Sequence, residues 1–206
     1  MSFHTEQEKF WATDFGNDYP SRNEGEKMIS CNLALFSKIF KNCPSIQSAA
    51  ELGCNIGLNL IALNRINNQL KLRGYEINEN AAKAALEENI SEIVNTTIVE
   101  PLNTNTTFDL TFTKGVLIHI NPEMLPTVYQ NLYDLSNRYI LVCEYYNPAP
   151  VSIDYRGNKD RLFKRDFAGE LMQKYALKLV DYGFNYQHDP YLTNDDTTWF
   201  LMEKSS

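Results

Sequence analysis

The stretch Glu51-Leu52-Gly53-Cys54-Asn55-Ile56-Gly57 decides the fold of this 206-residue chain. The short apolar run that leads into it, residues 48–52, is typical of a strand, and the apolar spacing over residues 57–66 is typical of a helix. Glycines at a strand-to-helix turn let the backbone approach a ligand closely, and the helix N-terminus adds a partial positive charge. The stretch therefore predicts a cofactor-binding turn at the carboxyl end of a strand.

Outward from this turn, short apolar runs alternate with helical patterns along the chain. The predicted strands cover residues 48–52, 70–75, 96–99, 108–113, 139–144, 177–184 and 197–203, and the predicted helices cover residues 29–40, 57–66, 78–90, 122–135 and 166–175. Alternation at this spacing indicates βαβ units, so we expect an α/β, Rossmann-like three-layer sandwich on a mostly parallel seven-stranded sheet. The last two strands follow each other without a helix, which favours an antiparallel C-terminal strand.

A carboxylate, Glu76, lies at the end of the second predicted strand. An acid at this place can accept hydrogen bonds from both ribose hydroxyls of an adenosine-bearing cofactor. A tight turn followed by a solvated glutamate is the alternative interpretation. A dinucleotide needs glycine in the middle of the turn so that its pyrophosphate can lie on bare backbone. Asn55 stands at that position and disfavours a dinucleotide.

Two signatures along the chain resemble those of a known enzyme superfamily. The E-x-G-x-x-x-G form of residues 51–57 resembles the S-adenosylmethionine signature of Rossmann-like class I methyltransferases, and the run FDLTFTKGVLIHI at 108–120 is similar to their fourth strand and following turn. More narrowly, the chain resembles the methylases associated with pseudaminic acid biosynthesis. This narrower resemblance is carried by residues 10–23, 144–148, 162–170, 180–184 and 196–200, and so spans nearly the whole chain.

The resemblance implies S-adenosylmethionine as the cofactor. The cofactor-binding residues that it implies are Tyr19, Arg22, Glu51, Gly53, Cys54, Asn55, Gly57, Glu76, Ile77, Pro101, Leu102, Thr113 and Lys114. The chain departs from the superfamily pattern at Asn55, which replaces the middle glycine, and at Glu100-Pro101, which replace a Gly-Asp pair. The adenine contact expected after the third strand therefore falls to Glu100, Pro101 or Leu102.

Three residues that follow the fourth and fifth predicted strands are candidates for catalysis. In this fold the acceptor faces the carboxyl ends of these strands. His119 has a pKa range that suits a base for a hydroxyl acceptor, and the hydroxyls of Tyr145 and Tyr146 can orient a hydroxyl or amino acceptor. A structural histidine, and two tyrosines that pack beneath the next loop, are the alternatives.

The charge of the chain is unevenly distributed. Lys and Arg number 19 against 26 Asp and Glu, and this net charge of −7 disfavours binding to nucleic acid or to an anionic membrane. Residues 156–165 reverse the sign with five bases and one acid, at the end of an insertion, residues 145–165, that shows no clear periodicity. We expect a small anionic substrate there, such as a sugar acid or nucleotide sugar, and a solvated charged face is the alternative. The predicted substrate-binding residues are Arg156, Arg161, Lys164 and Arg165.

The whole chain, residues 1–206, is expected to form a single methyltransferase domain. Its expected parts are an N-terminal arm and helix covering the cofactor (1–45), a cofactor-binding core (46–144), a substrate-side insertion (145–165), and a C-terminal helix and strand hairpin (166–206). The aromatic part of the arm is interpreted either as a strap packed on the domain or as a lid over a ligand. The scattered cysteines predict a cytoplasmic protein without a metal or disulfide framework.

Two further functions remain open at this point. One is a nicotinamide-dependent reductase, which Asn55 disfavours. The other is a noncatalytic module that binds the cofactor and regulates a partner. The oligomeric state also remains open.

Overall fold

The centre of the fold is a sheet with the strand order β3-β2-β1-β4-β5-β9-β8, seven strands in the described part of the chain. The computed structural model describes residues 3–13, 16, 25–102, 105–155 and 157–205, so the expectations on Tyr19, Arg22 and Arg156 lie outside the described residues. The strands are β1 (Ser48–Leu52), β2 (Lys71–Glu76), β3 (Glu92–Asn95), β4 (Phe108–Lys114), β5 (Ser136–Glu144), β8 (Leu177–Phe184) and β9 (Thr198–Lys204). Strands β1 to β5 pair in parallel, whereas β9 is antiparallel to β5 and β8. The mostly parallel sheet with an antiparallel C-terminal strand is confirmed.

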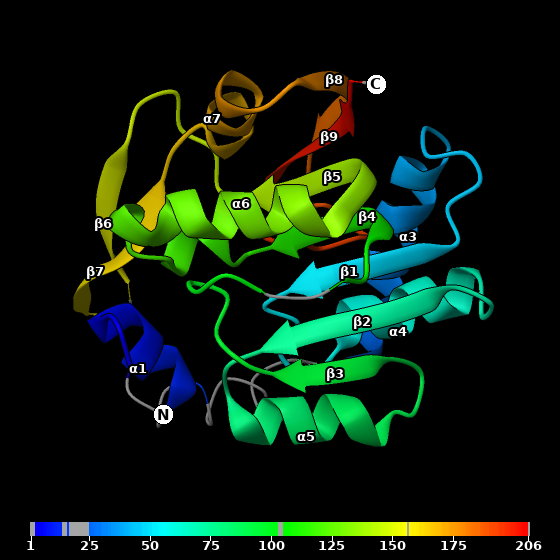
Figure 1. The fold of residues 1–206 in the computed structure, drawn as a ribbon, viewed down its shortest axis with the longest axis horizontal. Helices are drawn as coiled ribbons and strands as arrows, with labels where there is room; N and C mark the ends of the chain where they lie inside the picture. Colours follow the sequence, from blue (N-terminus) through cyan, green and yellow to red (C-terminus); the bar gives the residue numbers. More distant parts are fainter. Residues whose placement is uncertain (1–2, 14–15, 17–24, 103–104, 156, 206) are drawn as a thin grey trace.

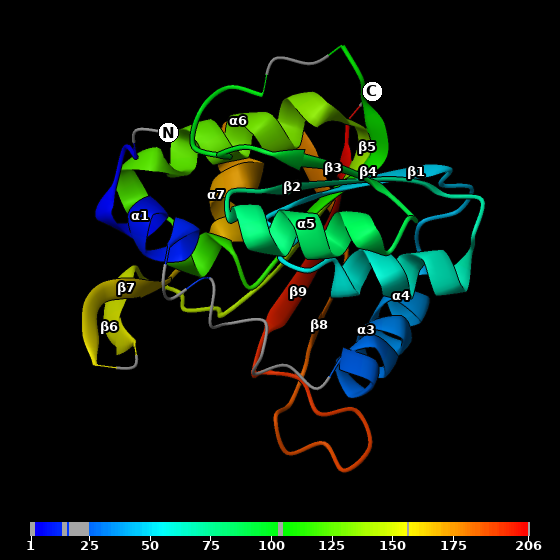
Figure 2. The ribbon, with the colours of Figure 1, turned by 90° about the horizontal axis from the view of Figure 1, so that it is seen from below.

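Helices cover both faces of this sheet (Figure 2). The helices on one side are α3 (Gly25–Phe40), α4 (Leu58–Ile66) and α5 (Glu79–Glu87), and those on the other side are α6 (Leu125–Leu135) and α7 (Phe167–Lys174). The three layers predicted from the alternation of strands and helices are therefore present. Within the residues that the structure describes, no helix is both long enough and apolar enough to cross a membrane.

Short-range signals determine where the helices beside the sheet begin. The Asn78 side chain accepts a hydrogen bond from the backbone N–H of Ala81 at 2.9 Å and so caps α5. Helix α4 follows Gly57, whose φ of 82° lets the chain turn directly from β1 into the helix. Both helix N-termini consequently lie at the carboxyl ends of the strands that precede them.

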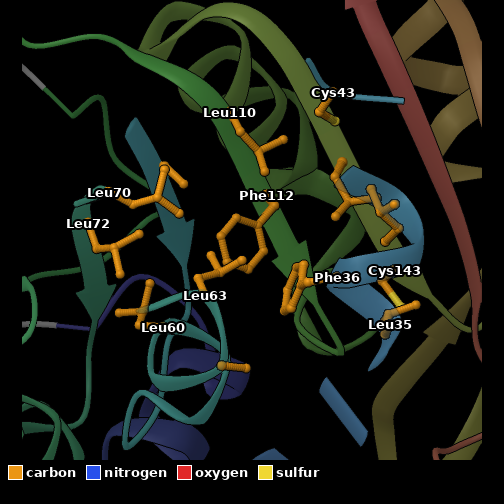
Figure 3. Close-up of a cluster of buried hydrophobic side chains, with 14 of the residues drawn as sticks. Leu35, Phe36, Cys43, Leu60, Leu63, Leu70, Leu72, Leu110, Phe112 and Cys143 are labelled. Carbon is orange, nitrogen blue, oxygen red and sulfur yellow. The ribbon is translucent and has the colours of Figure 1, made fainter. Parts of the chain in front are cut away.

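The core is divided by the sheet into two apolar clusters. Figure 3 shows the first, in which Leu60 and Leu63 of α4 and Phe36 of α3 pack toward Phe112 of β4. The rings of Phe36 and Phe112 meet edge to face with their centroids 5.4 Å apart. The second cluster lies between the opposite face and helices α6 and α7. Apolar burial on both faces fixes the central strands and leaves their carboxyl ends for a site.

The prediction of a third strand over residues 96–99 is wrong, because β3 is Glu92–Asn95. Glu92 is set opposite Arg73 of β2, and an ion pair joins them with Nη2 and Oε2 2.6 Å apart. Ile98 is buried as irregular chain beside α6, where the Nδ2 group of Asn131 donates a hydrogen bond to its carbonyl oxygen at 2.9 Å. The apolar character of this segment reflects burial against a helix rather than pairing in the sheet.

The insertion and the N-terminal arm contain regular elements that the sequence did not reveal. Strands β6 (Val151–Tyr155) and β7 (Asn158–Lys164) form an antiparallel hairpin, and helix α1 (Glu6–Ala12) lies in the arm. The side chains of β6 are mostly exposed on both faces, so no alternation of polar and apolar residues marks it. Both views place the hairpin beside α1, and the arrowheads of β1, β2 and β3 point toward this end of the molecule (Figure 1).

Candidate functional site

A cavity of about 240 Å³ lies at the carboxyl ends of β1, β2 and β4. Strands β1 and β4 are neighbours in the sheet, but the chain continues from them in opposite directions, to β2 and to β5. Such a switch point is where open α/β sheets bind their ligands. The predicted site residues that line the cavity are Gly53, Cys54, Asn55, Glu76, Ile77, Lys114, His119 and Tyr145. The structure therefore brings together the core of the predicted cofactor site and two of the three catalytic candidates.

The turn after β1 has a backbone that requires glycine. Gly53 has a φ of 81°, and its N–H donates to the carbonyl oxygen of Tyr75 at 2.8 Å, which ties the turn to β2. A Cβ atom on Gly53 would lie 2.7 Å from a methyl group of Val116, in the segment that follows β4. The glycine thus allows the chain segments after β1 and β4 to approach each other closely.

Glu76 is buried at the end of β2 and faces this turn. Its Oε2 atom accepts a hydrogen bond from the N–H of Asn55 at 2.8 Å, and its Oε1 atom accepts one from the N–H of Asn78 at 2.8 Å. Burial raises the pKa of Glu76, and these backbone groups act in the opposite direction. Because a carboxylate offers about four acceptor positions, the group keeps room for a ligand hydroxyl.

Glu51 lies fully buried beneath the turn. Its Oε1 atom accepts a hydrogen bond from Nδ2 of Asn59 at 2.6 Å. Burial raises the pKa of Glu51 to about 8, against the lowering effects of Asn59 and of the nearby Lys114 charge.

Several buried oxygen atoms beside the turn have no hydrogen-bond donor among the described residues. These atoms are Oε2 of Glu51 and the Oδ1 atoms of Asn32, Asn55 and Asn59. Buried acceptors are normally paired, and leaving one unpaired is costly. Since all three asparagines line the cavity, this wall fits a ligand that brings several N–H and O–H donors, such as an ammonium group and ribose hydroxyls. The residues present thus fit S-adenosylmethionine.

His119 lines the same cavity and lies in the short 3₁₀ turn Leu117–His119. Its Nδ1 atom lies 2.7 Å from the carbonyl oxygen of Arg161, an arrangement in which Nδ1–H donates and Nε2 carries the lone pair. Its ring contacts those of Trp11 and Tyr155, at centroid distances of 4.5 and 5.0 Å. Burial lowers the pKa of His119 to about 4, so the ring is neutral at physiological pH.

Glu144, at the end of β5, holds the turn that carries His119. Both of its carboxyl oxygens lie within hydrogen-bond distance of the N–H of Val116, at 3.1 and 3.0 Å. Burial raises the pKa of Glu144 to about 7, against hydrogen bonds from the backbone of residues 116–118. The sequence analysis did not include Glu144 among the site residues, although an acid at the carboxyl end of a buried strand is the signal that identified Glu76.

Helix α1 closes the cavity with residues that the sequence analysis also missed. Gln7, Glu8 and Trp11 line the cavity. The Nε2 group of Gln7 donates to the carbonyl oxygen of Asp160 in the hairpin at 2.9 Å, and Glu8 accepts a hydrogen bond from the Thr97 hydroxyl on the opposite rim. Helix α1 is therefore bonded to two separate segments at the cavity. Residues 14, 15 and 17–19 of the aromatic stretch lie outside the described residues, so the strap and lid interpretations both stay open.

The remaining cofactor candidates lie outside the cavity lining. Pro101 is exposed and the N–H of Leu102 donates to Asn131. Residues 96–99 line the cavity in place of the residues 100–102 at which an adenine contact was expected. Gly57 packs beneath the site near Ala85, and Thr113 is buried within β4.

The basic side chains described in the insertion, and Tyr146, are not part of the cavity lining. Tyr146 is 44% exposed and packs against Phe200. Arg165 pairs with Glu170, with Nε and Oε1 2.7 Å apart. Arg161 lies 3.6 Å from Glu6 and over the ring of Phe10, and Lys164 lies over the ring of Tyr145. The structure therefore does not gather these three cations around the cavity.

Comparison with solved structures identifies the fold. The chain is similar to magnesium protoporphyrin IX methyltransferase from Synechocystis PCC 6803 with bound SAM, at a TM-score of 0.67 and 14% identity over 100% of both chains. It is also similar to the plantazolicin methyltransferase BpumL in complex with SAH, at a TM-score of 0.67 and 13% identity, covering 97% of this chain and 94% of that chain. A third similar structure is an S-adenosylmethionine-dependent methyltransferase from Clostridium acetobutylicum ATCC 824. Its TM-score is 0.65 and its identity 10%, and the match covers 93% of this chain and 98% of that chain. No family model and no curated protein matches the sequence. The chain thus has the Rossmann-like methyltransferase fold.

Proposed function

We propose that this protein is an S-adenosylmethionine-dependent methyltransferase acting on a small acceptor. The observation that carries the proposal is the pairing of Glu76 with the glycine turn: a buried carboxylate at the end of β2, held 2.8 Å from the N–H of Asn55, beside a wall of unpaired oxygen acceptors. The similar solved structures with bound SAM or SAH support the same cofactor. The acid excess of the cavity lining suits a cofactor with a net positive charge.

Each part of the cavity has a separate task under this proposal. Glu76 binds the ribose hydroxyls, the N-terminus of α4 and the oxygens of Asn32, Asn55 and Asn59 receive the amino-acid portion, and residues 96–99 border the adenine. When bound, the cofactor supplies an electrophilic methyl group that passes to an acceptor lone pair as the carbon–sulfur bond breaks. The protein positions the acceptor and excludes water, with α1 as the cover.

The anionic acceptor expected from the basic run gains no support from the described contacts. Arg165 is engaged by Glu170 and Arg161 lies beside Glu6, so neither points a charge into the cavity. The resemblance to methylases associated with pseudaminic acid biosynthesis remains the support for a sugar acid or nucleotide sugar. The chemistry of the cavity wall offers a more direct argument about the acceptor.

Calorimetric titration with S-adenosylhomocysteine tests the proposed cofactor. We expect micromolar binding by the unaltered protein and at least a ~10-fold loss in Glu76→Ala, because hydrogen bonds to a charged group are worth about 1.5–3 kcal/mol. Glu79→Ala, an exposed acid on α5 that pairs with Lys83, is the matched control and should bind normally. Absence of binding, or binding of reduced nicotinamide dinucleotide in its place, would overturn the proposal.

A further inference from the structure

The end of the cavity nearest α1 and the hairpin is built from rings. Trp11 comes from α1, Tyr155 from β6, His119 from the turn after β4, and Tyr145 from the end of β5. Ile118 and Ile120 also line the cavity, as do the polar side chains of Gln7, Glu8 and Asn121. Rings contributed by four separate segments present flat, apolar surfaces to whatever occupies this end of the cavity.

At this end of the cavity, His119 presents an unprotonated ring nitrogen. Its Nδ1–H group is committed to the Arg161 carbonyl oxygen at 2.7 Å, so Nε2 is left as a hydrogen-bond acceptor. The rings of Trp11 and Tyr155 both pack against the imidazole and hold it in place. A lone pair so fixed recognises a ligand that offers an O–H or N–H hydrogen.

The charges around the cavity disfavour an anion in this place. Among the described residues, the cavity lining contains three acids, Glu8, Glu76 and Asp195, and one base, Lys114. Lys114 lies close enough to the buried Glu51 to lower the pKa of that carboxyl. An anionic acceptor would therefore meet an excess of negative charge in the lining, three acids against one base.

We infer that the aromatic end of the cavity takes an uncharged, ring-bearing acceptor, of the phenol class, whose hydroxyl hydrogen is donated to Nε2 of His119. The inference rests on the proposed methyltransferase function and names its acceptor class. The rings of Trp11 and Tyr155 bind the flat face of the acceptor. His119 orients the hydroxyl so that an oxygen lone pair faces the methyl donor. On transfer, the oxygen–carbon bond would form as the carbon–sulfur bond breaks, and the hydroxyl proton would pass to Nε2 of His119. Tyr145 borders the same space from the end of β5.

Calorimetry with a pair of ligands that differ in one charge tests this inference. The protein is saturated with S-adenosylhomocysteine and titrated with methyl para-hydroxybenzoate or with para-hydroxybenzoate, which share a ring and hydroxyl. We expect the uncharged ester to bind at least ~10-fold more tightly than the carboxylate, since like charges placed together in a binding site are strongly unfavourable. Equal or tighter binding of the carboxylate, or no binding of the ester, would overturn the inference.

Two variants separate the effect of the hydrogen bond to His119 from the effect of ring packing on acceptor binding. His119→Leu should weaken binding of the ester by about tenfold, yet bind methyl para-methoxybenzoate, which has no hydroxyl hydrogen, about as well as the unaltered protein does. Tyr155→Leu should weaken both probes together. Retained binding of S-adenosylhomocysteine shows that each variant is folded. If S-adenosylhomocysteine binds but His119→Leu leaves the affinity for the ester unchanged, only the inference about the acceptor fails. If S-adenosylhomocysteine binds to no form of the protein, the proposed function fails as well.

Discussion

At His119 a single hydrogen bond determines which form of the ring the site presents. The Arg161 carbonyl oxygen requires a proton on Nδ1, and burial lowers the pKa of the ring to about 4. We expect the ring to remain the neutral Nδ1–H tautomer between pH 5.5 and 8. Two-bond ¹H–¹⁵N spectra check this, because the protonated and unprotonated nitrogens have distinct shifts. A shift of both ¹⁵N resonances toward the imidazolium value near pH 6.5 would contradict it.

The raised pKa of Glu144 predicts how stability depends on pH. A carboxyl group whose folded pKa is raised from 4.5 to about 7 favours folding most below pH 4.5, and this contribution is lost as the pH rises through 7. Glu144→Gln imitates the protonated form. The variant should therefore lose less stability than the unaltered protein between pH 5 and 8, by on the order of 1–3 kcal/mol.

Urea unfolding of Glu144→Gln and of the unaltered protein, at pH 5 and at pH 8, measures this difference in the loss of stability. Exposed Glu123→Gln serves as the control and should keep the pH dependence of the unaltered protein. Glu51, with its pKa raised to about 8, acts in the same direction, so the variant should retain part of the slope. An unchanged slope in Glu144→Gln would show that Glu144 is already ionised in the folded protein near pH 5.

Gly53 and Gly157 form a matched pair for testing the glycine turn. Both have positive φ, 81° and 80°, but a Cβ would meet Val116 at 2.7 Å in the first case and open space in the second. Gly157→Ala should cost about 1 kcal/mol of unfolding free energy, whereas Gly53→Ala should cost roughly 2–4 kcal/mol and weaken S-adenosylhomocysteine binding. Urea unfolding and calorimetry measure the two effects, and equal costs would mean that Val116 yields without strain.

Among the elements, those that could be predicted carry a local signal and those that were missed depend on distant contacts. Strand β1 (Ser48–Leu52) was predicted with its observed bounds because it is a short apolar run ended by glycine. Strand β3 was misplaced because its position depends on the pairing of Arg73 with Glu92, which periodicity does not reveal. Helix α1 has only 7 residues, too few to be stable alone, and Gln7 and Glu8 hold it through contacts with remote segments.

The attachment of α1 through Glu8 predicts how the cover opens. Glu8 accepts hydrogen bonds from the Thr97 hydroxyl and from the N–H of His4, the latter at 2.6 Å. Glu8→Ala removes both bonds. Since hydrogen bonds to a charged group contribute about 1.5–3 kcal/mol, amide exchange in α1 should accelerate by at least ~10-fold while the core strands keep their protection.

Hydrogen-exchange mass spectrometry with and without S-adenosylhomocysteine measures the opening of α1. Glu6→Ala is the control, because Glu6 is exposed and its contact with Arg161 is long at 3.6 Å. The ligand should slow exchange in α1 of the unaltered protein, since Trp11 lines the cavity. Acceleration throughout the sheet in Glu8→Ala would mean that Glu8 supports the fold rather than the cover.

At the scale of the whole molecule, the sheet topology determines where the site lies, but it does not determine which acceptor the site takes. The turn after β1 and the acid at the end of β2 carried enough information to predict the cofactor end, because parallel strands bring their carboxyl ends to one edge. The acceptor end joins α1, β6 and the turn after β4, which are far apart along the chain. The ring contacts of His119 and the pairing of Arg165 with Glu170 arise only when the chain is folded, so the basic run was interpreted as a substrate clamp.

Because the cofactor site joins segments from both halves of the sheet, ligand binding should stabilise the molecule as a whole. A ligand that binds only the folded state contributes about 2.7 kcal/mol at a concentration 100 times its dissociation constant. For a domain of this size that raises the unfolding temperature by roughly 5–10 °C. Differential scanning fluorimetry should show this rise with S-adenosylhomocysteine and none with reduced nicotinamide dinucleotide. Glu76→Ala, at the same ligand concentration, should lose most of the rise because the buried carboxylate that receives the ribose is gone. A rise with the dinucleotide and none with S-adenosylhomocysteine would instead assign the cavity to a reductase, despite Asn55 in the turn.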